Sequence, residues 1–180
     1  MLSLSSRILS DLGIPSSPPC QSVISIWYGK WEKAGVVHKL NEIGRYRIHI
    51  YPLSFVDLAL KDTVEVISTF DRTLSILTPK PPMYMSSLIR YLLQHPVGDN
   101  SRFRIEYDLV SFISSYILRD KPLNTKEMEE EESEEDFQRR VEEGVQWMKT
   151  WDWGATEEKY LIIAERVVRY CPSIQQLSDC

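Results

Sequence analysis

Basic side chains recur at alternate positions in two stretches of this sequence. Arg45 and Arg47 belong to the first stretch, and Arg102 and Arg104 belong to the second. Alternate residues of a strand share one face, so each pair would lie roughly 7 Å apart, near the spacing of successive phosphates. The loop expected before the first stretch adds three lysines, Lys30, Lys33 and Lys39. The pattern indicates a surface for an RNA backbone or anionic lipid head groups, unless these residues only keep a sheet soluble.

The sequence contains none of the short motifs that usually position catalytic residues. It has no GxSxG nucleophile turn, no GxxxxGK(S/T) phosphate loop and no HExxH metal motif. Its three histidines are scattered and its three cysteines form no CxxC pair, so four convergent zinc ligands are not indicated. We therefore predict a non-enzymatic protein with no cofactor, metal or small-molecule substrate, whose cysteines are free thiols in a reducing compartment.

Acidic residues are concentrated in one segment. Residues 124–143 contain ten acids and three bases, whereas the other 160 residues contain 16 acids and 18 bases. We predict a solvated acidic loop at about 124–136. A second interpretation is that this loop is an electrostatic partner for the basic surface, within one molecule or between neighbours. Such complementarity would favour head-to-tail assembly.

Two groups of apolar and aromatic residues are candidates for self-association. Met83 and Tyr84 follow the proline-rich joint 78–82, which we expect to be an exposed, conformationally restricted connection because proline supplies no backbone donor. The second group contains three closely spaced tryptophans, Trp147, Trp151 and Trp153. Core packing is the ordinary role of such a cluster, but an exposed member would mark a contact site.

The elements that position these residues predict an α+β fold. We expect a flexible, Pro-rich N-terminal arm over residues 1–20. A single domain over 21–180 would follow, in which a small antiparallel sheet packs with several helices. Neither a signal peptide nor a transmembrane segment is expected, because no window approaches the ~20 apolar residues of a membrane span.

Periodicity assigns these elements to residue ranges. Alternating or β-branched residues predict strands over 22–28, 45–51 and 102–108. Apolar residues spaced by three and four predict helices over 54–77, 83–94, 137–151 and 156–170. Residues 109–118 and 160–170 leave helix and strand both open, because they are rich in β-branched side chains.

This arrangement resembles the matrix proteins of rhabdoviruses, in particular the short ones of plant-infecting members. The resemblance covers about residues 45–95. It depends on the segment Val64-Glu65-Val66-Ile67-Ser68-Thr69-Phe70-Asp71-Arg72, a Pro/Lys joint and the apolar segment Leu88-Ile89-Arg90-Tyr91-Leu92-Leu93. It implies a virion structural protein that self-associates and bridges a viral nucleocapsid to anionic membrane, in the virion and the host cytoplasm. The alternative is a cytoplasmic adaptor or host-targeting viral accessory protein, in which the aromatic cluster docks a partner.

Overall fold

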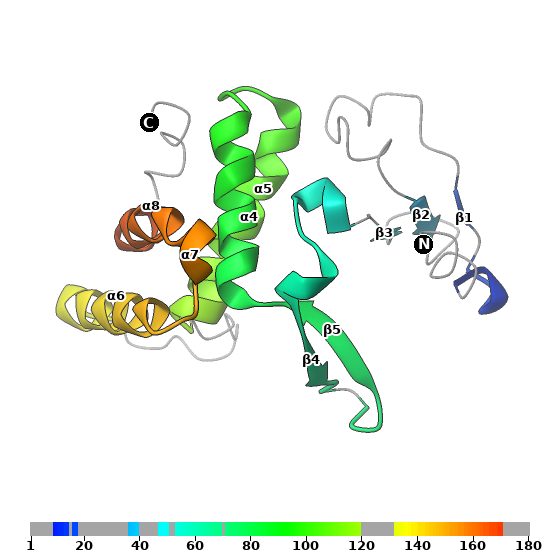
Figure 1. Ribbon diagram of the computed structural model, residues 1–180, viewed down its shortest axis with the longest axis horizontal. Helices are drawn as coiled ribbons and strands as arrows, with labels where there is room; N and C mark the ends of the chain where they lie inside the picture. Colours follow the sequence, from blue (N-terminus) through cyan, green and yellow to red (C-terminus); the bar gives the residue numbers. More distant parts are fainter. Residues whose placement is uncertain are drawn as a thin grey trace.

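The computed structural model describes residues 9–14, 16–17, 36–39, 47–50, 53–69, 71–119 and 132–170. After a helical turn at residues 9–11, strands precede the main helices along these ranges (Figure 1). The architecture is therefore α+β, as the sequence predicts.

The most N-terminal strands form an antiparallel sheet in the order β1–β2–β3. Its members are β1 (Ser16–Ser17), β2 (Val36–Lys39) and β3 (Arg47–Ile50). The buried His38 ties β2 to the chain before β1, since its Nδ1 lies 2.8 Å from the carbonyl oxygen of Ile14. The strand predicted over 45–51 is confirmed where the structure describes it, whereas the one predicted over 22–28 lies outside the described residues.

A β-hairpin occupies the region where the apolar spacing predicts a helix. Two short 3-10 turns, η1 (Leu53–Val56) and η2 (Leu60–Asp62), lead into β4 (Thr63–Ile67), which pairs antiparallel with β5 (Ser75–Pro79). The predicted helix over 54–77 is therefore wrong. Its β-branched residues fit a pleated strand better than a helix, where they lose side-chain freedom.

The turn of this hairpin is held by Asp71. Its carboxylate accepts hydrogen bonds from the backbone N–H and the hydroxyl of Thr73, at 2.9 and 2.6 Å. The side-chain bond and then the backbone bond lower the pKa of Asp71. In Figure 1 the hairpin extends away from the helices.

Helix α4 (Pro81–Gln94) confirms the helix predicted over 83–94. The proline joint, however, is not an exposed loop: Pro79 ends β5, and Pro81 and Pro82 are the first residues of α4, with Pro82 buried. Proline is well suited to the first helical turn, where the missing N–H has no intrahelical acceptor.

Helix α5 (Asn100–Phe112) runs on into a π-helical segment, η3 (Ile113–Ile117). The strand predicted over 102–108 is therefore wrong. Ile105, Leu109 and Ile113 recur every four residues and are all buried, which is the periodicity of one helix face. Residues 109–117, left open by the sequence, are helical.

Three further helices complete the body: α6 (Glu134–Lys149), α7 (Gly154–Glu157) and α8 (Lys159–Arg169). They confirm the helices predicted over 137–151 and 156–170, the latter divided at Glu158. Helix α6 starts where the Ser133 hydroxyl accepts the N–H of Asp136 at 3.1 Å, an ordinary N-cap.

The core lies among the helices. Its fully buried side chains include Met85 and Ile89 of α4, Leu109 of α5, Val145 of α6 and Val167 of α8. Together these elements form a single hydrophobic cluster, and β4 and β5 contribute no buried residue to it. The hairpin is consequently available for contacts outside the core.

Candidate interaction surfaces

The predicted phosphate-binding residues divide into an N-terminal group and a pair on α5. Within the N-terminal group, Lys30, Lys33 and Arg45 lie outside the described residues. Lys39 and Arg47 are directly paired in the β2–β3 register. The register therefore sets two basic residues opposite each other on adjacent strands.

Arg102 is not a surface residue, contrary to the prediction. It is 1% exposed, and its Nη1 donates to the carbonyl oxygens of Leu92 and His95 at 2.5 and 2.7 Å. Its Nε donates to Glu106 at 2.5 Å. These carbonyls belong to the end of α4, where the last carbonyl groups lack intrahelical donors. Arg102 therefore fastens α4 to α5 and has no access to a phosphate.

Arg104 lies two residues further along α5, on a different face from Arg102. Its side chain is 63% exposed and pairs with Asp108, one turn later, at 3.2 Å. Two residues of a helix are separated by about 200°, so Arg102 and Arg104 cannot share the surface expected from a strand.

The predicted self-association residues Met83 and Tyr84 are half-buried in the first turn of α4. The Tyr84 ring packs edge-on against Phe112, with centroids 5.1 Å apart. Burial, followed by the nearby Asp108 carboxylate, raises the pKa of Tyr84. These contacts hold α4 against α5, so the two residues are part of the packed body and not of an exposed loop.

The three tryptophans belong to a continuous group of aromatic rings at the junction of α5, η3 and α6. Trp147 and Trp151 meet edge-on at 5.2 Å, and Trp151 stacks on Trp153 at 5.9 Å. Trp153 is buried and its Nε1 donates to the Met148 carbonyl at 3.0 Å, so it packs in the core. Of the three tryptophans, Trp147 and Trp151 are half-buried and present part of a ring at the surface.

The β4–β5 hairpin carries exposed apolar side chains on both of its strands. The register pairs Val66 with Ile76 and Val64 with Thr78, which places all four on one side of the hairpin. We call Val64, Val66 and Ile76 the hairpin face. These side chains remain 36–49% exposed, although none carries a polar group. A face of this kind is typical of a sheet that packs against another surface.

The opposite side of the hairpin is mixed in character. Ile67 and Leu77 are 69% and 60% exposed there, beside a hydrogen bond from Ser75 to Glu65. Among the described residues, neither β4 nor β5 pairs with a third strand. Both strands therefore offer one edge of free backbone donors and acceptors, which is a template for further pairing.

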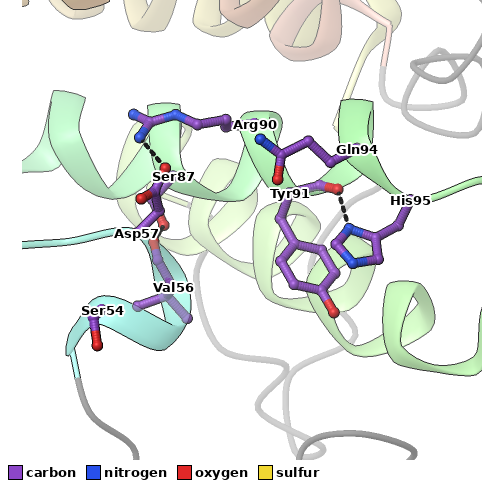
Figure 2. A pocket seen from close by; sticks show the side chains of 8 residues that line it. All are labelled: Ser54, Val56, Asp57, Ser87, Arg90, Tyr91, Gln94 and His95. Carbon is purple, nitrogen blue, oxygen red and sulfur yellow. Dashed lines mark hydrogen bonds and ion pairs between the residues drawn. The ribbon is translucent and has the colours of Figure 1, made fainter.

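A pocket of about 340 Å³ lies between η1 and α4 (Figure 2). At one end, the Arg90 guanidinium pairs with Asp57 and also with Glu157 of α7, the latter at 3.0 Å. The carboxylates neutralise this arginine, and its guanidinium carbon lies 5.5 Å from the centroid of the Tyr160 ring. Arg90 of α4 thus links the residue that follows η1 to α7, and its charge is already compensated.

The other end of this pocket is formed by the rings of Tyr91 and His95, which Figure 2 shows side by side. The two rings are stacked, with their centroids 3.8 Å apart and an angle of 7° between their planes. His95 Nδ1 donates a hydrogen bond to the Tyr91 carbonyl oxygen at 2.8 Å. The Ser87 hydroxyl donates to the Val56 carbonyl. These groups therefore make structural hydrogen bonds with the backbone.

The hairpin face is the surface that sequence reasoning missed. Its residues lie in the segment 54–77 that was predicted to be a helix, and only Val64 belonged to the apolar stripe of that helix. The alternation Thr63-Val64-Glu65-Val66 and the Asp71-Arg72-Thr73 turn were the available signals, because period-two patterning and an aspartate that binds its own backbone are typical of hairpins.

In the described part of the chain, no helix is long and apolar enough to cross a membrane, and no three His, Cys, Asp or Glu side chains converge as a metal site.

The comparisons with known proteins found no relative of this chain. No protein-family model matches the sequence, and neither the curated proteins nor the solved structures contain a match.

Proposed function

We propose that this protein is a non-enzymatic structural protein that self-associates through its β4–β5 hairpin, as a matrix-like coat protein would. The observation that carries the proposal is the hairpin face, an apolar surface on an element that contributes nothing to the core. A two-stranded hairpin alone is at best marginally stable in water, so packing against a partner would stabilise it.

A second copy of the chain is a suitable partner because the hairpin face is self-complementary. Val64, Val66 and Ile76 carry no charge and are all β-branched, so two such faces can pack together across a two-fold axis. Stacked sheets lie about 10 Å apart, a distance that side chains of this size fill. The free strand edges offer an additional route, in which hairpins of neighbouring copies pair.

The exposed area predicts weak association. Complete burial of a Val or Ile side chain contributes about 1.5–3 kcal/mol, so covering the remaining 36–49% contributes roughly 1 kcal/mol each. Three side chains from each copy give roughly 6 kcal/mol, near the lower end of the 4–15 kcal/mol that association costs in lost freedom. A dimer would therefore be concentration-dependent, and repeated contacts in a lattice would strengthen it.

We extend the proposal to binding of a viral nucleocapsid and of anionic membrane, on the basis of the N-terminal basic residues. Support comes from the β2–β3 register, which pairs the backbone positions of Lys39 and Arg47. Such a surface would hold a backbone or head group without reading bases. Flotation with acidic liposomes and binding of single-stranded RNA test this part separately from self-association.

The hairpin contact is tested with the double variant Val66→Thr, Ile76→Thr. Threonine keeps a β-branched shape and strand propensity, while a hydroxyl replaces a methyl group of Val66 and the ethyl group of Ile76. A dimer of the variant contains both changes in each copy. We therefore expect the free energy of dimerisation to become less favourable by roughly 2–3 kcal/mol, which corresponds to about 30- to 150-fold weaker dimerisation. Sedimentation velocity over a range of concentrations measures this.

Ile162→Thr is the matched control, because Ile162 is 77% exposed on α8, away from the hairpin. It should associate like the wild type. A double variant that associates as strongly as the wild type would show that the hairpin is not the contact. A wild type that stays monomeric at every concentration and ignores acidic liposomes would favour the adaptor function instead.

A further inference from the structure

A second pocket, of about 390 Å³, lies where the π segment ends against α6. Its lining includes Arg119, which follows the π segment, and Arg140 and Trp147 of α6. Gly144 allows the close approach of the two elements, since a Cβ at this position would lie 3.1 Å from the Ile117 side chain. The pocket therefore has a tightly packed base and two guanidinium groups in its lining.

Arg119 presents its charge from a strained backbone position. Its φ is +57°, in the left-handed region where glycine would be the less costly choice. The guanidinium carbon lies 5.0 Å from the centroid of the Trp147 ring, and the described residues provide no carboxylate partner for it. An exposed arginine held in this way at a pocket is placed to receive an anion.

Arg140 shows which kind of anion the pocket accepts. Its Nε and Nη2 donate to the two carboxylate oxygens of Glu132, at 3.0 and 2.6 Å, in a two-pronged arrangement. Its Nη1 donates to the Leu118 carbonyl at 3.1 Å, which fixes the orientation of the guanidinium. Glu132 belongs to the acidic run Glu127–Asp136, in which eight of ten residues are acidic.

We propose that this pocket binds the acidic run of a second copy of the chain. One carboxylate would pair with Arg119, and another would replace Glu132 on Arg140. The inference rests on the proposed self-association and identifies its second contact. Glu132 of the same copy competes for Arg140 and is always close to it, which favours the local contact. An acidic run from a second copy can pair with Arg119 as well as Arg140, and this additional contact offsets the advantage of Glu132. Glu143 also lines the pocket and limits the number of further anions it accepts.

The test uses the full-length protein and a fluorescein-labelled peptide with the sequence of residues 124–136. At about 50 mM salt, where exposed charges are weakly screened, fluorescence anisotropy should show saturable binding. The same peptide with Gln and Asn in place of its acids should not bind. Arg119→Gly should weaken binding about two- to fivefold, as loss of an exposed charge pair does. Because glycine relieves the positive φ, the thermal midpoint of this variant should equal or exceed that of the wild type.

Lys159→Ala is the matched control, because Lys159 is also an exposed cation over an aromatic ring, 4.9 Å from the Tyr160 centroid, but does not line the pocket. It should bind the peptide like the wild type. Failure of the wild type to bind the acidic peptide, or wild-type binding by Arg119→Gly, would overturn the proposal. It would equally be overturned by a single-stranded RNA oligonucleotide that binds tighter than the peptide and depends on Arg119.

The hairpin variant Val66→Thr, Ile76→Thr separates this inference from the proposed function. It should bind the acidic peptide normally, because the pocket is formed by other elements. Association at the hairpin face should persist at about 500 mM salt, whereas peptide binding should be lost as the charges are screened. If the peptide does not bind but association still depends on the hairpin, only the acidic-run contact is refuted. If the peptide binds but the hairpin variant associates like the wild type, only the hairpin proposal is refuted.

Discussion

Arg102 offers the sharpest test of the helical body, because the strand prediction and the structure assign it opposite roles. On a strand it would be an exposed phosphate ligand whose loss weakens binding and leaves stability unchanged. In the structure it is buried and donates to Leu92, His95 and Glu106. Arg102→Met keeps much of the aliphatic stem but removes every one of these hydrogen bonds.

The expected cost follows from what the substitution leaves behind. Removing one partner of a buried charge pair costs about 3–5 kcal/mol, and a buried carbonyl without a donor costs roughly 1–3 kcal/mol. The Glu106 side chain is 22% exposed and regains some hydration, so the lower part of this range applies. We expect Arg102→Met to lower the free energy of unfolding by about 3–4 kcal/mol. Arg102→Lys should restore little of this stability, because a lysine ammonium lacks the planar, forked arrangement of N–H donors of a guanidinium.

Urea unfolding followed by circular dichroism measures this cost. With a slope of roughly 2 kcal/mol per molar urea, the midpoint should fall by about 1.5–2 M. Arg104→Met is the control. Its arginine is exposed and pairs with Asp108 one turn away, so its loss should cost about 0.5 kcal/mol or less. If both variants unfold at the same urea concentration, the buried anchor does not exist and the reasoning is refuted.

Two further predictions concern α6. Gly144→Ala should destabilise the protein although alanine favours helices by about 1 kcal/mol, because the new Cβ would lie 3.1 Å from Ile117 and 3.2 Å from Leu118; urea unfolding should show a net loss. Hydrogen bonding, first from Arg169, lowers the pKa of Glu142 from 4.5 to about 2. A lowered carboxyl pKa stabilises the fold above pH 4.5, and this contribution is lost as the pH falls towards 2. Unfolding midpoints of Glu142→Gln should therefore fall less over that interval than those of the wild type.

The sequence predicts elements well where local signals agree. In α4, Leu88 and Leu92 recur on the helical period, and Pro81 is at a position that proline favours. In α6, Ser133 caps a helix whose apolar residues lie on one face. These features act within a few residues, so no knowledge of the tertiary fold is needed to interpret them.

The wrong predictions arise where the two-residue period of a strand and the 3.6-residue period of a helix fit the same residues. Arg102 to Asp108 alternates between charged and apolar residues, yet Arg102–Glu106 and Arg104–Asp108 are also helical ion pairs one turn apart. In the hairpin, the choice of strand depends on pairing between β4 and β5, such as Val66 with Ile76. That pairing is not contained in either segment alone. The pocket at Arg119 gave no sequence signal, because its positive φ and its contact with Trp147 exist only in the fold.

The series of aromatic rings also contributes to how the protein absorbs and emits light. Tyr84, Phe112, Tyr116, Trp147 and Trp151 follow one another with neighbouring centroids 5.0–5.4 Å apart. Rings this close exchange excitation, so their near-ultraviolet spectra are coupled. Separation of α4, α5 and α6 would abolish the coupled signal even if each remained helical. Intrinsic fluorescence is therefore a label-free optical gauge of helix docking.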